Sequence, residues 1–455
     1  MPEPREQMVQ RLAQTVAREG GRVYYVGGFV RDRLLGRENK DIDIEVHGVT
    51  PAKLEEILDT LGHRMQIGES FGVYALKGYD VDIAMPRCEN ATGRGHKDFA
   101  ISVDPFIGTK KAATRRDFTI NAMMEDVLTG EIVDHFGGRE DLQNGLIRHV
   151  NDLSFAEDPL RVLRGAQFAA RFRFAIAPET IALCRTMDLS ALSRERIEGE
   201  MKKALLKADE PSIFWNEMRR MNQLSYWFPE LEALIGLEQS PKFHPEGDVW
   251  THTLCVLDKA AQLRHRAVQP FPFMMSALCH DIGKTVTSEE IEGVIHAYKH
   301  EVEGLPLVER LLTRLTGEKK LIAYVLNMVE NHMRPNTMAR HQSSLKATNH
   351  LFDDSLEPLD LILLAMADAQ GTGTYVPDHS SEAFLLERLD KYRELMQKPA
   401  VMGRDLIEAG LKPDSTFTDL LAYAHKLHLA GVPKELALRQ TLSYARQLKA
   451  QNADS

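Results

Sequence analysis

The stretch that most constrains how this chain can fold runs from Val23 to Glu45, VYYVGGFVRDRLLGRENKDIDIE. It opens with a short run of β-branched and aromatic residues, which is typical of a strand, and two adjacent glycines interrupt that run. Apolar residues at helical spacing follow and stop at Gly36, so a glycine turn and a short helix are predicted after the strand. Residues 40–45 alternate between charged and apolar, which predicts a second strand.

The second strand places two carboxylates, Asp41 and Asp43, on the same face, where they repel each other. A divalent cation removes this repulsion, and Mg²⁺ prefers carboxylate and phosphate oxygens. The turn at Gly27 and Gly28, directly before a helix, lets backbone N–H groups approach a phosphate closely. Either feature alone is commonest as an ordinary turn or a solvated strand edge. Their order in one short stretch indicates a nucleotidyl-transfer site that holds a triphosphate beside Mg²⁺.

Two later segments contribute candidate residues to this site. The strand predicted over 79–85 carries Asp82, which we prefer to Asp80 as a third carboxylate because it leads directly into the apolar end of the strand. Arg116 and Asp117, in RRDFTINA, precede an expected helix start and suit contacts with a triphosphate or a sugar. A charged helix start is the commoner meaning of such a pattern alone.

From about residue 151 the pattern becomes helical, and one helix opens within AEDPLRVLR. Glu157 and Asp158 precede Arg161 by four and three residues, so the three side chains can meet on one side of the helix. Spacing alone would make this an ordinary salt bridge.

A second group of candidate residues is rich in histidine. His252 lies in a helix predicted over 249–263, and His280 with Asp281 ends another helix. Asp368 lies in an apolar helix and points toward a core, where an unpaired charge is very costly. Metal coordination would remove that cost, and imidazole with carboxylate suits Ni, Mn, Fe, Co or Zn.

Three further histidines could hold a second metal in the same region. His296 and His300 are four residues apart and would share a helix face if that segment is helical, and His332 follows a short helical run.

Six ordered motifs resemble those of one known family: GGFVRD, KDIDIE, VDIAMPR, RRDFTINA, DHFGGREDL and AEDPLRVLR. They are similar to the class II tRNA nucleotidyltransferases, the CCA-adding enzymes, which are related to bacterial poly(A) polymerases. The match covers about residues 20–210. It implies an α+β fold, in which a polymerase-β-like nucleotidyltransferase head with a small mixed sheet is followed by all-α neck, HD and tail domains. It also implies a flexible loop over residues 86–112, which lack periodicity.

The resemblance also implies roles for particular residues. Catalysis and Mg²⁺ binding fall to Asp41, Asp43 and Asp82. Nucleotide contacts fall to Gly27, Gly28, Arg31, Arg116, Asp117, Glu157, Asp158, Arg161 and Arg164. One departure is Gln167, where many relatives have a second arginine, which puts a phosphate contact from that position in doubt.

The implied choice of C and A has a chemical rationale in the helix that carries Arg161. Cytosine and adenine each present an amino donor beside a ring acceptor, whereas guanine and uracil present the reverse. A carboxylate acceptor next to a guanidinium donor therefore accepts C and A. Asp158 and Arg161 supply that pair, and Glu157 is expected to orient Arg161.

The H…HD…D order of the histidine-rich region resembles the HD superfamily of metal-dependent phosphohydrolases. It implies a metal such as Ni²⁺ or Mn²⁺ on His252, His280, Asp281 and Asp368, and phosphatase or 2′,3′-cyclic phosphodiesterase activity. The expected domains are a head (1–150), a helical neck that recognises the base (151–235), an HD domain (236–398) and a helical body and tail that binds tRNA (399–455).

The composition is that of an ordinary soluble protein: 455 residues, 43% hydrophobic, with a net charge of −10. No apolar run approaches 18 residues, so no membrane partner is expected. The four cysteines are scattered, which fits reduced thiols in the cytoplasm. The expected partners are tRNA, CTP and ATP, and nothing in the residues indicates an oligomeric state.

Three alternative functions remain. A poly(A) polymerase would have the same fold. A CC-adding enzyme is expected to lack the flexible loop, and the loop residues Gly93, Gly95 and Asp98 argue against it. A non-enzymatic nucleotide sensor has no need of a carboxylate pair such as Asp41 and Asp43.

Overall fold

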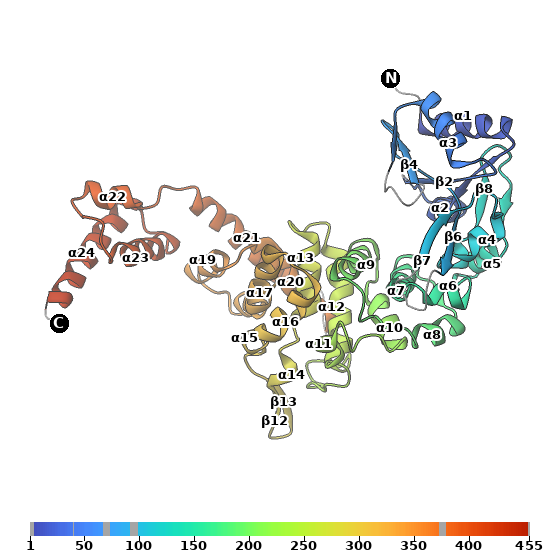
Figure 1. Cartoon of the computed structure of the whole chain (residues 1–455). Coiled ribbons are helices and arrows are strands. Elements are labelled where there is room, and N and C mark those ends of the chain that lie inside the picture. The colour runs from blue at the N-terminus through green and yellow to red at the C-terminus, as the bar shows by residue number, and fades with distance from the viewer. Residues whose placement is uncertain (1–3, 40, 67–72, 92–98, 373–378, 454–455) are drawn as a thin grey trace. The chain divides into compact units, whose positions relative to one another are not determined.

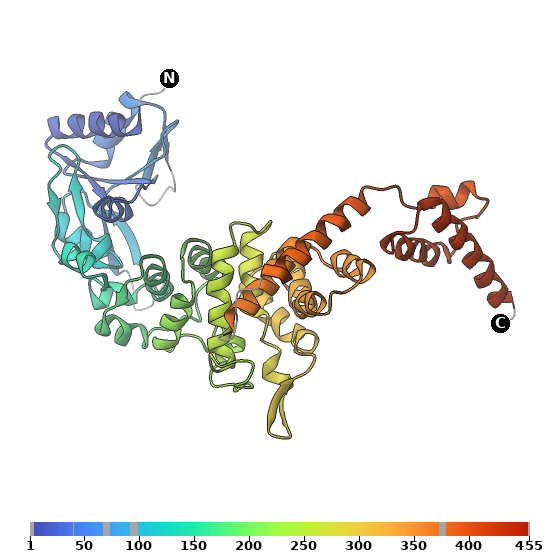
Figure 2. The ribbon, with the colours of Figure 1, turned by 180° about the vertical axis from the view of Figure 1, so that it is seen from behind.

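A computed structural model describes residues 4–39, 41–66, 73–91, 99–372 and 379–453 of the chain (Figure 1; seen from behind in Figure 2). The described residues form two compact units. The first comprises residues 1–192 and 216–223, and the second comprises residues 193–215 and 224–455.

A small mixed sheet organises the first unit, with strand order β3-β4-β5-β2-β1-β8-β9. Only the central pair, β2 with β5, is parallel among the paired strands of this sheet. The predicted α+β class with a small mixed sheet is therefore confirmed. The strands are β1 (Arg22–Val26), β2 (Ile42–His47), β3 (Arg64–Gln66), β4 (Val73–Leu76), β5 (Val81–Ala84), β8 (Met124–Asp126) and β9 (Ile132–Val133).

The opening stretch folds as predicted. β1 ends at Val26, Gly27 turns the chain with a φ of 66° that favours glycine, and α2 (Gly28–Leu34) follows before β2. Ile42 and Ile44 of β2 are fully buried, because the sheet packs this face against the core. The alternating carboxylates consequently belong to the opposite face.

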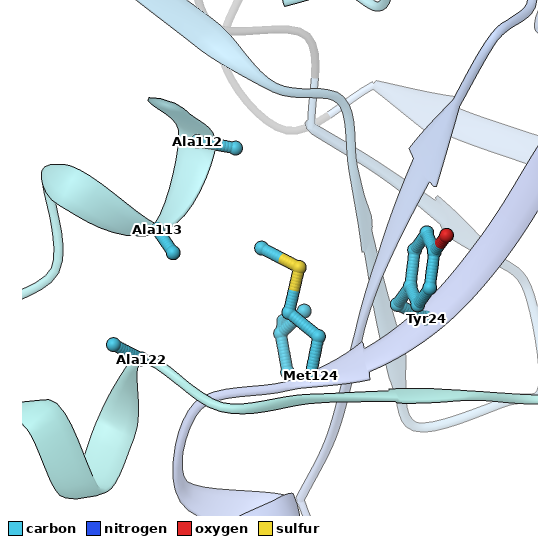
Figure 3. Close-up of a cluster of buried hydrophobic side chains, with 6 residues drawn as sticks. Tyr24, Ala112, Ala113, Ala122 and Met124 are labelled. Atoms are coloured by element: carbon cyan, nitrogen blue, oxygen red, sulfur yellow. The ribbon is translucent and has the colours of Figure 1, made fainter. Parts of the chain in front are cut away.

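A hydrophobic cluster beneath the sheet links it to the helices that follow (Figure 3). Ala112 and Ala113 come from α4 (Thr109–Thr114), and Met124 and Tyr24 come from β8 and β1. The other helices of this unit are α1 (Arg5–Arg18), α3 (Pro51–Leu61), α5 (Gly138–Gln143), α6 (Asp152–Ala156), α7 (Leu160–Phe172) and α8 (Pro178–Cys184), and α10 (Ser212–Arg220) has residues in both units.

Two local predictions in this unit were wrong. The expected loop over residues 86–112 contains β6 (Arg87–Ala91) and β7 (Phe99–Val103), which pair antiparallel, and then α4. The two strands are stabilised by backbone hydrogen bonds to each other, and this pairing leaves no periodic pattern in the sequence from which it could be predicted. Residues 92–98, with Gly93, Gly95 and Asp98, lie outside the described residues. The expected helix start in RRDFTINA is a single 3₁₀ turn, Thr119–Asn121, before β8.

The second unit is helical apart from one hairpin. Helices α12 and α20 pack together in its interior, and a separate small core joins the last three helices. None of the helices in the part of the chain that the structure describes is long and apolar enough to cross a membrane. The helices are α9 (Arg194–Lys207), α11 (Pro229–Glu232), α12 (Val249–Leu263), α13 (Pro270–Cys279), α14 (Lys284–Thr287), α15 (His300–Glu303), α16 (Leu305–Leu315), α17 (Lys319–Asn331), α18 (Met333–Arg340), α19 (Leu345–Asp354), α20 (Pro358–Gly371), α21 (His379–Met396), α22 (Gly403–Glu408), α23 (Phe417–Leu429) and α24 (Lys434–Ala453), and the hairpin is β12 (Ser288–Ile291) with β13 (Val294–Ala297).

Candidate active sites

Three carboxylates gather at the parallel pair of strands in the first unit. The register of β2 with β5 places Asp43 directly beside Asp82, and Asp41 precedes Asp43 by two residues. Burial raises the pKa of Asp43, and the Asp82 and Asp41 carboxylates raise it further against the opposing charge of Arg116. Asp41 and Asp82 are exposed. An acidic cluster of this kind fits a hard divalent cation.

The glycine turn adjoins this carboxylate cluster. A Cβ atom built on Gly27 would lie 3.5 Å from Arg116 Nη1 and 3.9 Å from Asp43 Oδ2. The turn, a guanidinium and a carboxylate that could bind a metal therefore meet at one place. This arrangement suits a triphosphate, whose oxygens need backbone N–H groups, a cation and a metal at once.

One residue that the sequence reasoning missed connects these groups. Glu45 is buried on β2, where its Oε2 accepts from Arg116 Nη2 at 3.2 Å and its Oε1 lies 2.8 Å from His47 Nε2. Burial opposes ionisation of Glu45, but the bonds with His47 and Arg116 outweigh it and lower the pKa. The alternation of Asp41 and Asp43 continues to Glu45, and this was the signal that could have found it.

Arg31 and Asp117 lie within a buried polar network beside the turn. Arg31 donates to Asp32 Oδ1 and Asn121 Oδ1, and its guanidinium lies over the ring of Phe168. Asp117 accepts from Arg164 through Oδ2 and from Asn121 through Oδ1. These contacts favour a positioning role for both side chains, and their predicted direct contact with the nucleotide stays a prediction.

The EDxxR motif spans the junction between α6 and α7. Glu157 is the C-cap residue of α6, and Asp158 Oδ1 accepts from the backbone N–H of Leu160 in the first turn of α7. Arg161 donates to the backbone carbonyls of Ser154 and Arg115. Its guanidinium is therefore held in place by backbone oxygens, and the predicted orientation of Arg161 by Glu157 stays a prediction.

The second unit brings the predicted HD residues together in its interior. His252 Nε2 lies 3.1 Å from Asp368 Oδ1, and His280 Nε2 lies 3.2 Å from Asp281 Oδ2 and 3.4 Å from His252 Nε2. His252 and His280 are fully buried, and Asp281 is only 2% exposed. Four donor atoms of this type at this spacing fit a transition-metal ion.

Two more histidines complete a second ligand group around the same aspartate. His300 Nε2 lies 3.2 Å from Asp281 Oδ1 and 3.4 Å from His332 Nε2. The two carboxylate oxygens of Asp281 thus face two histidine pairs. His296 is not part of either group among the described residues. The expectation that His296 and His300 share a helix face was wrong, because His296 lies on β13 and α15 begins at His300.

The other ring nitrogen of each histidine in the cluster is already engaged. His280, His300 and His332 have Nδ1 within 2.9 Å of the backbone oxygens of Ala277, Ala297 and Val329. His252 Nδ1 lies 2.8 Å from Glu246 Oε1. Such contacts place the proton on Nδ1 and leave Nε2 as the ligand atom, the arrangement that metal-binding histidines commonly have.

The electrostatics of the cluster also fit a cation. Burial opposes ionisation of Asp281, but the charges of His280 and Lys284 keep its pKa well below the usual range. Burial together with His280 and His300 lowers the pKa of His332 to about 4, so this imidazole is neutral. Lys284 Nζ lies 2.7 Å from Asp281 Oδ2, an oxygen that has no well-formed hydrogen bond among the described residues.

Two glycines bring the segment of His300 against the segment of Asp281. A Cβ atom on Gly283 would lie 2.0 Å from His300 O, and one on Gly304 would lie 2.5 Å from Gly283 Cα. The two segments are so close that neither position has room for a side chain. We call this close approach of the two backbones the Gly283–Gly304 contact. The HD motif HDIG therefore positions the second histidine pair as well as the first.

Comparisons with known proteins find a family model that matches part of each unit. The poly A polymerase head domain model matches residues 23–148, the model of a probable RNA and SrmB-binding site of polymerase A matches 173–235, and the HD domain model matches 249–395. The chain is 37% identical over 409 residues to the multifunctional CCA protein of Pseudomonas aeruginosa, covering 86% of this chain and 93% of that protein. The chain belongs to the multifunctional CCA protein family.

Other members and solved structures agree with this family. The multifunctional CCA protein of Actinobacillus pleuropneumoniae is 38% identical over 361 residues, which cover 77% of this chain and 85% of the relative. The Bacillus stearothermophilus CCA-adding enzyme in complex with CTP has a TM-score of 0.69 at 20% identity, over 99% of this chain and 100% of that chain. The Thermotoga maritima CCA-adding enzyme complexed with tRNA has a TM-score of 0.63 at 22% identity, over 98% and 96%. These structures confirm the fold of a CCA-adding enzyme.

Proposed function

We propose that this member of the multifunctional CCA protein family adds C, C and A to the 3′ end of tRNA, with CTP and ATP as substrates. The observation that carries the proposal is the meeting of Asp43 and Asp82 with the Gly27 turn and Arg116 in the polymerase-like head. A carboxylate cluster beside a phosphate-binding turn is the arrangement that nucleotidyl transfer needs.

Each part of the head has a defined task in this proposal. Asp41, Asp43 and Asp82 would hold Mg²⁺, which supplies activation of the primer 3′-hydroxyl and stabilisation of the leaving pyrophosphate. Arg116 and the backbone of Gly27 and Gly28 hold the triphosphate. Glu45 holds the Arg116 side chain beside the triphosphate. The network of Arg31, Asp117 and Arg164 holds α7 against the glycine turn.

A direct experiment separates the alternative functions. The protein is incubated with tRNA lacking its 3′ end and each nucleoside triphosphate separately and together, and the added nucleotides are sequenced. We expect two C residues and then one A. Addition of C alone would identify a CC-adding enzyme, a run of A a poly(A) polymerase, and no addition a nucleotide sensor.

The metal assignment has its own test. Asp41→Ala or Asp43→Ala should lower nucleotide addition by several orders of magnitude, since each supplies a metal ligand that the remaining carboxylates cannot replace. Folding should persist, because Asp41 is exposed and Asp43 is opposite the buried isoleucine face. More than about a tenth of the parent's activity in either variant would contradict the assignment.

We further propose that the HD domain is a metal-dependent phosphohydrolase for phosphate ends, including 2′,3′-cyclic phosphates. His252, His280 and Asp281, with Asp368 beside His252, would hold one ion such as Ni²⁺ or Mn²⁺, and Asp281, His300 and His332 would hold a second. Bound metal supplies an activated water for attack on phosphorus. Transition-metal content measured per chain should be two ions in the parent and one in His332→Ala.

A further inference from the structure

The HD metal cluster opens into a cavity that is much larger than a phosphate group requires. The cavity has a volume of about 920 Å³, and Asp281, His300 and Asp368 form part of its wall. Cavities of roughly 300–1,000 Å³ accommodate ligands of the size of a nucleotide. Most of this space therefore remains for the part of the substrate that carries the phosphate.

Exposed aromatic side chains line the same cavity. Tyr298 is 62% exposed and follows β13, and Phe243 is 57% exposed and precedes α12. Single exposed aromatic residues are unremarkable on a protein surface. Two of them on the wall of one cavity, beside a group of metal ligands, indicate a ligand with a flat apolar face.

Tyr298 directly follows the β12–β13 hairpin, whose position in the second unit Figure 1 shows. The imidazole of His296 stacks on the Tyr298 ring, with centroids 5.0 Å apart and planes at 9°. We call these two residues the His296–Tyr298 pair. His296 covers one face of the tyrosine, and the high exposure of Tyr298 leaves ring surface available to a ligand.

The His296–Tyr298 pair is linked directly to the metal ligands. His300 comes two residues after Tyr298, and the Gly283–Gly304 contact fixes this segment against Asp281. A nearby cation, Arg340, is exposed on the cavity wall and forms no ion pair with any residue that the structure describes. One short segment thus presents a stacking surface and a metal ligand, with a guanidinium available for an anion or a base edge.

We propose that the His296–Tyr298 pair is the base-binding element of the HD cavity, on which the base of a phosphohydrolase substrate stacks. Stacking on an aromatic ring accepts any base, since each base has a π face. The inference rests on the proposed phosphohydrolase function, and it adds recognition of the base to it. The nucleotide is either free or the last residue of an RNA.

The test compares ligands with and without a base on the full-length protein. Binding of adenosine 2′-phosphate and of ribose 2-phosphate is measured by calorimetry, and KM is measured for the corresponding 2′,3′-cyclic phosphates. We expect Tyr298→Ala to weaken binding and raise KM for the adenosine compounds by roughly 10-fold or more, with little change for the ribose compounds. Tyr298→Phe should retain parent values.

A matched control is Ile291→Ala on the same hairpin, which is exposed and does not line the cavity. Equal affinity of the parent for adenosine and ribose ligands, or an equal effect of Tyr298→Ala on both, would overturn the inference while leaving phosphohydrolase activity in place. Absence of hydrolysis with base-dependent binding would instead contradict the phosphohydrolase function alone. An RNA ending in a 2′,3′-cyclic phosphate, compared with the free nucleotide, identifies the source.

Discussion

At the scale of single residues, the geometry of the candidate site in the head depends on contacts between charged side chains that are buried or half-buried. Glu45 is the clearest case, since one carboxylate connects His47 to Arg116 and leaves Arg116 Nη1 at the glycine turn. Charge-assisted hydrogen bonds of this kind are stronger than neutral ones and fix geometry. Both carboxylate oxygens of Glu45 are engaged, by His47 and by Arg116, so its effect should be on where Arg116 lies.

Replacing Glu45 with Gln should raise KM for CTP and ATP by about 10-fold, because a hydrogen bond to a charged group contributes roughly 1.5–3 kcal/mol. The kcat value should change much less. The control is Glu55→Gln, which removes a carboxylate that pairs with Arg64 and Tyr74 instead. A fall in kcat with unchanged KM would contradict the positioning role.

Asp43 should make the metal-free protein sensitive to pH. Burial, together with Asp82 and Asp41, raises its pKa in the folded state. Its stabilising contribution is therefore present at low pH, where the carboxyl is protonated, and is lost as the pH rises through the folded pKa. Near neutral pH, metal-free Asp43→Asn should melt above the parent, and the difference should shrink toward about pH 4.

When Mg²⁺ is present, the parent should melt above Asp43→Asn, the opposite of the order without metal. Mg²⁺ should raise the melting temperature of the parent, because it binds the folded state, and should have little effect on Asp43→Asn. Asp80→Asn serves as the control, because it removes an exposed carboxylate just before β5 that is not one of the proposed metal ligands. Equal melting curves for parent and Asp43→Asn under both conditions would exclude Asp43 as a metal ligand.

Base selection is predicted to reside in Asp158 and Arg161. Asp158→Ala or Arg161→Ala should lose the preference for CTP and ATP over GTP and UTP by roughly 10- to 100-fold, since an unpaired buried polar group costs ~1–3 kcal/mol. General activity should fall less. Competition between the four nucleotides measures the preference, and an unchanged preference in either variant would rule out Asp158 and Arg161 as the template.

At the scale of secondary-structure elements, close backbone contacts assemble the HD cluster from separate segments. α15 lies against the loop after α13 because Gly283 and Gly304 carry no side chains. The position of His300 therefore depends on the segment that carries His280 and Asp281, and the reverse also holds. Pairing of this type was invisible in the sequence, where HDIG and the later glycine are separated by the β12–β13 hairpin.

Replacing Gly283 with Ala should disrupt the second metal site, because its Cβ atom would overlap the carbonyl oxygen of His300. We expect loss of one metal ion per chain and a destabilisation of about 1–3 kcal/mol, as overpacked cores show. Metal analysis and thermal unfolding measure these effects. Gly199→Ala is the control, since a Cβ atom there meets nothing within 4 Å.

The same scale separates what the sequence could predict from what it could not. Local patterns predicted the β1–turn–α2–β2 unit and the helices that carry His252, His280 and Asp368, because spacing determines them. Residue types also predicted the histidines and aspartates that the structure brings together as a candidate metal site. The β6–β7 hairpin, the position of His296 and the Glu45–Arg116 contact arise from tertiary pairing, which leaves no period in the sequence.

At the scale of the whole molecule, the two candidate sites lie in separate compact units. Asp41, Asp43 and Asp82 belong to the first unit, and the HD ligands belong to the second. Each cluster obtains its ligands from within its own unit, so neither requires residues of the other.

Changing His280 and Asp281 together to Ala should abolish metal-stimulated hydrolysis of 2′,3′-cyclic phosphates and leave nucleotide addition nearly intact. Both activities are measured on the same preparation, with circular dichroism to establish folding. Loss of nucleotide addition in a well-folded variant would show that the two sites are coupled. Asp43→Ala provides the reciprocal comparison, in which hydrolysis should persist.

The Gly283–Gly304 contact has a consequence for how this protein can change over evolutionary time. The backbone on both sides of the β12–β13 hairpin is anchored, so insertions, deletions and substitutions between Ser288 and Ile295 can alter the cavity rim while the metal ligands keep their places. Loops whose ends are held tolerate changes of length at small cost. The sequence of the hairpin can therefore diverge, and with it the ligand that the cavity accepts, while the histidine and aspartate cluster stays unchanged.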